Sequence, residues 1–202
     1  MYKFKRVFKK EDIALTDEGR DALIDPVLEQ ALSKININFD WENVGLTVES
    51  SDEDKKLKIK ENFYISLNGN PTSGNNYFTF TMLFEESSDK LLGLFTGMVK
   101  DGTHTTLYML LGADSNGSTD YFYRTTCIKQ YNKLCAFMPN VDRVSAFMKV
   151  GGTVQSKWTN PKVKEYLESL GVIIRPSEQD SNYIELIAPS SIYESEEFMQ
   201  VI

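Results

Sequence analysis

Alternating hydrophobic and polar positions open the chain. This period of two predicts a strand over residues 1–8 with one solvent-facing side. A helix signal follows: Asp25 and then Pro26 are typical of a helix N-cap and a first helical position. A helix over 26–35 is expected, since apolar residues recur there at helical spacing: Val27, Leu28, Ala31, Leu32 and Ile35.

The next stretch predicts a charged loop followed by a strand. Residues 52–56 form a run of charges that indicates a solvated loop. From residue 57 to 67 the period is two, which predicts a half-buried strand. Its apolar face would hold Leu57, Ile59, Phe63, Ile65 and Leu67. Residues 68–76, with two glycines, a proline and four asparagines, predict a loop.

Three closely spaced strands are expected after this loop, over residues 77–85, 91–100 and 104–111. Residues 87–89 and the pair at 101–102 have the composition of hairpin connections. The pattern therefore predicts an antiparallel meander. The third strand is the most continuously apolar, so we expect it to be central.

A helix is predicted to begin at Ser118 or Thr119 and to run to about Met138, where Pro139 stops it. Its buried side would consist of Phe122, Ile128, Tyr131, Leu134 and Cys135.

The last part of the chain predicts a strand over 144–150 and then a second capped helix. The Asn-Pro pair at 160–161 indicates a helix start, and Gly171 follows its end at Leu170. Val163, Leu167 and Leu170 would face inward. A final strand or hairpin is expected over 172–174 and 183–187.

Composition limits the function classes. The 202 residues are 41% hydrophobic and 25% charged, which is typical of a globular protein. A net charge of −7 argues against general affinity for nucleic acid, which depends on basic side chains. The first ten residues carry +5, however, which is typical of a solvated strand face and, less often, of a docking strip for an acidic partner.

The two cysteines, Cys127 and Cys135, fall in one predicted helix about 12 Å apart, too far to form a disulfide with each other. The sequence shows neither an apolar signal segment nor a stretch long enough to span a membrane. We therefore expect a reduced, cytoplasmic protein.

The order of strands and helices resembles the GNAT superfamily of acyl-CoA N-acyltransferases. The resemblance implies an α+β fold, with a mixed, mostly antiparallel sheet of about six to seven strands flanked by three or four helices. It implies one domain over residues 1–188, followed by an acidic and apolar tail over 189–202.

One short motif of the family binds the cofactor. In that family an Arg or Gln and two small residues precede a helix whose amides hold the pyrophosphate of acyl-CoA. Here Gly117 matches, and Asp114 replaces the Arg or Gln. The resemblance assigns acetyl-CoA or another acyl-CoA to Gly117, Ser118 and Thr119.

A second motif is the asparagine-headed last helix of the family, which ends in Leu-Gly. The resemblance assigns the cofactor arm to Asn160. The family's frequent tyrosine acid is Leu167 here, and Tyr166 lies one residue earlier, about 100° around the helix. Tyr166 is the candidate that would supply the proton. The residues in register are Asn160, Val163, Leu170 and Gly171.

Other proton-transfer groups are few. Glu85, at the end of a predicted strand, is the candidate general base acting through water. His104 is the only histidine, and it is expected to be a half-exposed strand residue. No spacing of ligands predicts a metal site.

Two functions follow. The first is an acyltransferase that moves an acyl group from acyl-CoA to an amine of a small molecule or protein. The alternative is a catalytically inactive GNAT-fold protein with an interaction or structural role, as in divergent phage proteins that are virion-associated or host-directed. Its docking elements would be the basic first strand and the C-terminal tail. Neither function predicts nucleic-acid or membrane binding.

Overall fold

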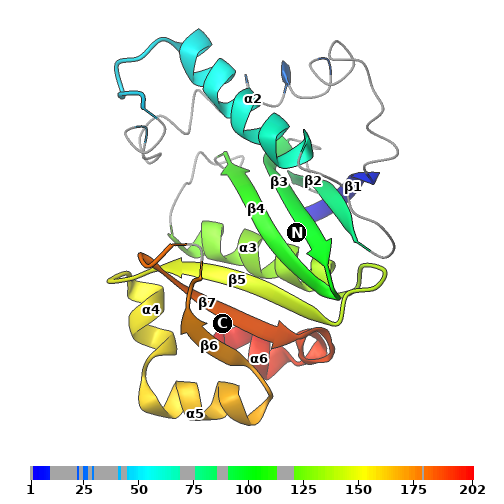
Figure 1. Cartoon of the computed structure of the whole chain (residues 1–202), viewed down its shortest axis with the longest axis vertical. Coiled ribbons are helices and arrows are strands. Elements are labelled where there is room, and N and C mark those ends of the chain that lie inside the picture. The colour runs from blue at the N-terminus through cyan, green and yellow to red at the C-terminus, as the bar shows by residue number, and fades with distance from the viewer. Residues whose placement is uncertain are drawn as a thin grey trace. The chain divides into compact units, whose positions relative to one another are not determined.

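Seven strands form one mixed sheet in the computed structural model (Figure 1). The strand order is β1-β2-β3-β4-β5-β7-β6. The structure describes residues 2–9, 22, 25–26, 29, 41, 45–68, 76–85, 91–112, 121–178 and 180–202. The strands are β1 (Tyr2–Lys9), β2 (Tyr77–Glu85), β3 (Leu91–Lys100), β4 (Thr103–Leu111), β5 (Arg143–Lys149), β6 (Ile173–Pro176) and β7 (Tyr183–Pro189).

The helices of the described residues are α2 (Asp52–Asn68), α3 (Tyr121–Ala136), α4 (Thr153–Trp158), α5 (Pro161–Ser169) and α6 (Glu196–Val201), with a 3-10 helix η3 (Ser190–Glu194). The predicted α+β class and the strand number are confirmed. In the described part of the chain, no helix has both the length and the apolar character needed to cross a membrane.

The chain divides into two compact units, which we describe separately. Unit 1 contains residues 1–98 and 107–127, and unit 2 contains residues 99–106 and 128–202.

The predicted meander is present. β2, β3 and β4 are neighbours in chain order, and β4 is the middle strand of the seven, as expected. Asp101 and Gly102 form the two-residue connection between β3 and β4, with φ values of 50° and 76°. Positive φ at both positions is the geometry of a type I′ hairpin turn, which glycine adopts without strain.

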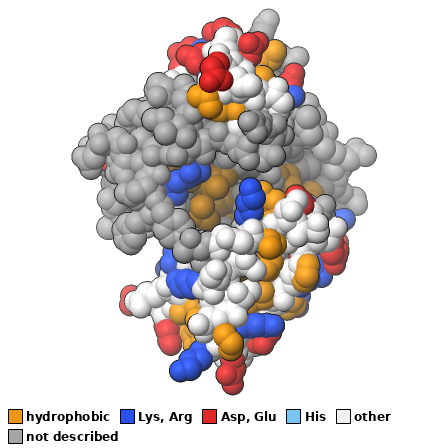
Figure 2. Space-filling view, turned by 90° about the vertical axis from the view of Figure 1, so that its left-hand side faces the viewer, with side chains coloured by type: hydrophobic (Ala, Val, Ile, Leu, Met, Phe, Trp, Pro, Cys, Tyr) orange, Lys and Arg blue, Asp and Glu red, His pale blue; other side chains and the backbone are white. Residues whose placement is uncertain are grey.

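In unit 1, the predicted loop and strand over residues 52–67 are wrong, because these residues form the helix α2. Ser51 caps it: the Ser51 Oγ accepts from the Asp54 amide at 3.1 Å and donates to the Asp54 carboxylate at 2.6 Å. Figure 2 shows acidic side chains gathered over this first turn, where they favour the positive end of the helix dipole.

The side chains of α2 show why the alternating pattern over residues 57–67 led to the wrong prediction of a strand. Leu57 and Ile59 are two residues apart, so on a helix they lie about 200° apart. Leu57 is 59% exposed and Ile59 only 1%. Lys55 is also buried: its Nζ donates to the Val48 carbonyl at 2.6 Å and lies 5.4 Å from the Trp41 ring centroid.

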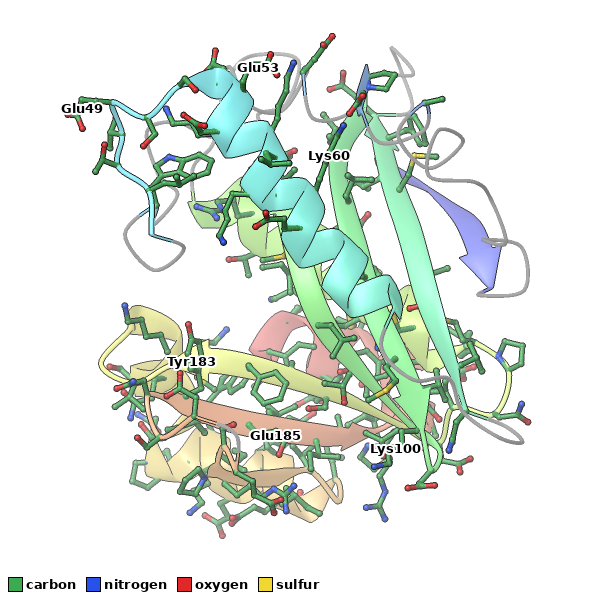
Figure 3. All side chains as sticks on the ribbon, turned by 45° about the horizontal axis from the view of Figure 1, so that its top comes forward. Glu49, Glu53, Lys60, Lys100, Tyr183 and Glu185 are labelled. Atoms are coloured by element: carbon green, nitrogen blue, oxygen red, sulfur yellow. The ribbon has the colours of Figure 1, made fainter. Side chains whose placement is uncertain are left out.

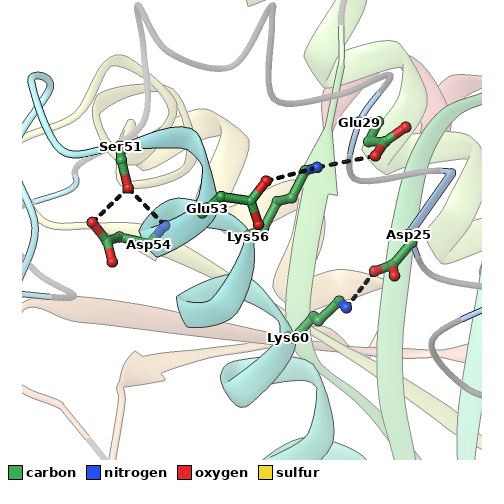
Figure 4. Close-up of polar contacts among 7 residues, drawn as sticks. All are labelled: Asp25, Glu29, Ser51, Glu53, Asp54, Lys56 and Lys60. Carbon is green, nitrogen blue, oxygen red and sulfur yellow. Dashed lines mark hydrogen bonds and ion pairs between the residues drawn. The ribbon is translucent and has the colours of Figure 1, made fainter. Parts of the chain in front are cut away.

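Two ion pairs join α2 to an earlier helical segment (Figure 4). Lys56 pairs with Glu29 at 3.0 Å, and Lys60 pairs with Asp25. Lys56 and Lys60 are four residues apart on α2, and Glu29 and Asp25 are four residues apart on the earlier segment. The later residue of α2 pairs with the earlier residue of that segment, so the two segments are antiparallel.

The predicted helix over 26–35 is partly described. Pro26 and Glu29 are helical, and so are Ala22 and Asp25. Asp25 is therefore inside a helix and is not its N-cap. The other residues of the predicted helix, including its apolar stripe, lie outside the described residues.

Helix α3, which begins in unit 1 and continues from residue 128 in unit 2, shows a buried face that differs from the predicted one. Tyr131 and Cys135 are buried as expected, but Ile128 and Leu134 are only half-buried. The side chain of Phe122 lies outside the described residues. Four buried positions follow a spacing of four residues along α3: Tyr123, Cys127, Tyr131 and Cys135. Asn132 and Ala136 are buried beside them, and both cysteines are free.

The C-terminal segment, residues 190–202, packs within unit 2. Tyr193 on η3 and Phe198 on α6 are both 0% exposed, and their ring centroids are 5.1 Å apart. The amines of Lys129 and Lys157 donate to the α6 carbonyls of Met199 and Gln200 at 3.0 and 3.3 Å.

Candidate functional site

The parallel pairing of β4 with β5 is short. It joins Thr103 to Arg143, His104 to Val144 and Thr105 to Ser145. Among the residues that the structure describes, the ladder ends at Thr105 and Ser145, although β5 continues to Lys149. Within that described part of the chain, residues 146–149 of β5, which we call the open edge, pair with β7 alone.

Backbone alternation identifies which groups face the open edge. The Val150 amide donates to the Asn182 carbonyl at 2.7 Å, so even-numbered residues of this strand direct their backbone groups toward β7. The Ser190 amide, which follows β7, donates to the Asp142 carbonyl at 2.7 Å, in agreement with this alternation, so odd-numbered residues of β5 direct their backbone groups the other way. Phe147 therefore directs its amide and carbonyl to the open edge, past the last rung of the ladder.

The two faces of β5 and β7 differ in burial. Even-numbered side chains form the more buried face: Val144, Met148, Leu186 and Ala188 are at most 6% exposed, and Ala146 and Ile184 are half-buried. On the odd-numbered face, Phe147, Tyr183 and Ile187 are half-buried, whereas Ser145 and Glu185 are buried. The buried polar residues of these two strands therefore lie on the odd-numbered face.

His104 lies on the buried face, and its predicted half-exposure is wrong. It is 0% exposed, and its ring meets Tyr131 of α3 edge to face at a centroid distance of 5.8 Å. Burial lowers the pKa of His104 to about 4, because the charged imidazolium loses its hydration. The side chain is therefore neutral at pH 7 and belongs to the core.

A polar cluster crosses the odd-numbered face, from β5 through β7 to β6. The Ser145 hydroxyl donates to Glu185 Oε1 at 2.7 Å, and Arg175 Nε donates to Glu185 Oε2 at 3.0 Å. Arg175 also pairs with Glu178 at 2.9 Å. Ser145 is 0% exposed and Glu185 is 9% exposed. Figure 3 labels Glu185 on β7, next to β5.

This cluster was not predicted from the sequence, although the sequence contains a signal for it. Ser145 and Glu185 are each a polar residue within an otherwise apolar strand, in VSAFM and YIELI respectively. An interrupting polar residue with a buried side chain requires a partner. The partner across the sheet is known only once the register of β5 with β7 is known.

The proposed acid, Tyr166, is on α5 and half-buried. Burial, and then the charge and hydrogen bond of Glu197 on α6, raise the pKa of Tyr166. Leu167, at the position where the resembling family has tyrosine, is 0% exposed. The helix is thus regular here, and Tyr166 does not take the place of Leu167.

Asn160 caps α5, as its sequence position predicts. Its Oδ1 accepts from the Lys162 amide at 3.1 Å, and Pro161 follows as the first helical residue. Gly171, just past the end of the helix, has a φ of 81°.

The remaining predicted residues belong to unit 1 or lie outside the described residues. Glu85 is the last residue of β2 in unit 1, half-buried, with Tyr2 as its Cα partner on β1. Gly117, Ser118, Thr119 and Asp114 lie outside the described residues. Within the described part of the chain, no group of three metal-ligating side chains is found.

A scan against protein-family models matches none of them, and a search of curated proteins finds no similar one. Among solved structures, the chain is similar to apo FdhC, described as a nucleotide-linked sugar GNAT. The identity is 11%, the coverage 98% of this chain and 92% of that one, and the TM-score 0.49.

The chain is also similar to a variant of the spermidine N-acetyltransferase SpeG from Vibrio cholerae, with 10% identity, 97% and 98% coverage and a TM-score of 0.42. The PaiA N-acetyltransferase from Thermoplasma acidophilum, in complex with coenzyme A, gives 12% identity, 94% and 99% coverage and a TM-score of 0.42. All three TM-scores are below 0.5, so the function proposed below rests on the geometry of this chain.

Proposed function

We propose that this protein is an acyltransferase that moves an acyl group from acyl-CoA to an amine acceptor. The observation that carries the proposal is the open edge of β5. The arm of acyl-CoA contains two secondary amides in an extended chain, and such a chain adds to a strand edge by main-chain hydrogen bonds. Phe147, whose amide and carbonyl face that edge, is the residue that would pair with the arm.

The pyrophosphate of the cofactor would be held by Gly117, Ser118 and Thr119, which precede the 16-residue helix α3. The first amides of a helix have no partner within it, and the helix dipole favours an anion there. Asp114 opposes this binding by charge repulsion. Asn160 has its Oδ1 in the α5 cap, so only its NH₂ group would contact the cofactor arm.

The chemistry requires a neutral amine, which attacks the thioester carbonyl and displaces the thiolate of CoA. Glu85 remains the sequence candidate for removing a proton from the amine, and Tyr166 the candidate for protonating the thiolate. To do this, the Tyr166 hydroxyl would have to leave the Glu197 carboxylate.

Calorimetric titration with acetyl-CoA tests the proposal. We expect saturable binding by the unmodified chain, and at least about tenfold weaker binding by Ser118→Glu, because the added carboxylate repels the pyrophosphate. Ser156→Glu, at an exposed position of α4, is the matched control and should bind as the unmodified chain does. No binding at millimolar acetyl-CoA would overturn the proposal and leave the inactive interaction protein as the function to test.

A further inference from the structure

We propose that Lys129 is a site of acylation by thioesters, and that its acylation weakens the packing of helix α6. The proposal goes beyond the acyltransferase function, because Lys129 itself is the amine and the acyl donor reacts with it from solution. It starts from two lysine amines of unit 2 that meet at one end of α6.

The two amines come from different helices and contact the last turn of α6. Lys129 Nζ, from α3, donates to the Met199 carbonyl at 3.0 Å, and Lys157 Nζ, from α4, donates to the Gln200 carbonyl at 3.3 Å. These carbonyls belong to consecutive residues, just before α6 ends at Val201. The last carbonyls of a helix have no partner within it, and the helix dipole is negative there, so the two amines cap this end.

This arrangement holds two like charges close together. Lys129 is half-buried, whereas Lys157 is exposed. Burial first, and then the charge of Lys157, lower the pKa of Lys129. The Lys129 amine is therefore neutral for a larger fraction of the time than the amine of an ordinary exposed lysine. The neutral amine is the form with a lone pair for nucleophilic attack.

The reaction needs a thioester as its co-reactant. The Lys129 ammonium first releases one proton to water. The nitrogen then attacks the thioester carbonyl carbon, a C–N bond forms, the C–S bond breaks, and the departing thiolate takes a second proton from the nitrogen. The products are an amide and a free thiol. Since Lys129 is only half-buried, a donor in solution reaches it once its contact with α6 opens.

Acylation removes one positive charge from the end of α6. The new amide keeps one N–H for the Met199 carbonyl, but it no longer favours the negative end of the helix dipole. The same helix carries Phe198, which is 0% exposed and packs against the ring of Tyr193. We therefore expect acylation of Lys129 to make local opening of the C-terminal segment easier.

Mass spectrometry of the full chain after incubation with a thioester tests the site. Two donors are used separately: acetyl-CoA, and S-acetyl-N-acetylcysteamine, which lacks the nucleotide. With both donors we expect Lys129 to be acetylated at least about threefold faster than Lys133, an exposed lysine of the same helix. Lys157→Gln should slow the acetylation of Lys129 at least about twofold, because the repulsion is removed. Lys162→Gln, at an exposed position of α5, is the matched control and should leave the rate unchanged.

Two outcomes would overturn the acylation site. One is that Lys129 reacts no faster than Lys133 with either donor. The other is a preference for Lys129 with acetyl-CoA alone, which would show that a cofactor site directs the reaction. Absence of acetyl-CoA binding in the calorimetric titration is a separate result: it contradicts the proposed acyltransferase, while the nucleotide-free donor still tests Lys129.

The effect on α6 is tested with two substitutions of Lys129. Lys129→Gln is neutral, as acetylated lysine is, and Lys129→Arg keeps the charge. We expect Cys135, whose charge acts on Tyr193, to react with a thiol reagent at least about twofold faster in Lys129→Gln, and at the unmodified rate in Lys129→Arg. Cys127, in unit 1, should keep its rate in both. Equal Cys135 rates in the two variants would overturn the role of the charge.

Discussion

At the scale of single residues, His104 gives a prediction about acid stability. Its pKa is lowered to about 4 in the folded chain, against about 6.5 when unfolded, so between these values the unfolded chain binds a proton that the folded chain does not. Stability therefore falls as the pH drops from 6.5 to 4, by about 3 kcal/mol from this residue. Urea unfolding across this range should show the fall, and His104→Gln should show a shallower one.

Because His104 is the only histidine, its ring proton signals in an NMR titration need no assignment. A titration midpoint near 6.5, or an unchanged slope in His104→Gln, would contradict the prediction. The same residue marks the limit of sequence reasoning at this scale. The strand that contains His104 was predicted. The sequence does not show whether a polar side chain in a strand faces solvent or a packed helix, and here His104 faces Tyr131 of α3.

At the scale of elements, the best predictions were those with a local physical cause. Asn160 with Pro161 located the start of α5, and the pair at 101–102 located a hairpin turn. The strand predicted over 57–67 failed because its alternation was read without its start signal, Ser51 followed by Asp54. Helix α4 was not predicted at all: its N-cap, Gly152, makes no side-chain cap hydrogen bond.

The cap of α2 can be tested directly. Ser51→Ala removes the hydroxyl that satisfies the Asp54 amide and should lower the free energy of unfolding by about 1 kcal/mol. Ser51→Thr keeps the hydroxyl and should retain most of that stability. Urea unfolding monitored by circular dichroism measures both. An equal loss in the two variants would mean that the hydroxyl does not stabilise the helix.

At the scale of the whole molecule, the class and the central strand of the sheet were predictable, whereas the site was not. Strand order followed from chain order and hairpin turns for β2, β3 and β4. The cluster of Ser145, Glu185 and Arg175 depends on the register of three strands that come from distant parts of the chain. Local sequence contains no information on such a register, so it could not identify which residues of this cluster meet.

The division into two units predicts different thiol reactivities. Cys127 belongs to unit 1 and Cys135 to unit 2, and both are free and 0% exposed. Phe198→Ala should leave a cavity beside Tyr193, whose pKa is raised first by burial and then by the charge of Cys135.

In Phe198→Ala, we therefore expect Cys135 to react at least about tenfold faster with a thiol reagent, because local opening of unit 2 becomes less costly. Cys127 should keep the rate of the unmodified chain. Mass spectrometry of labelled peptides distinguishes the two sites, and Leu57→Ala, at an exposed position, is the control. If both cysteines accelerate equally, the two units open as one through α3, and the C-terminal segment stabilises the whole chain rather than unit 2 alone.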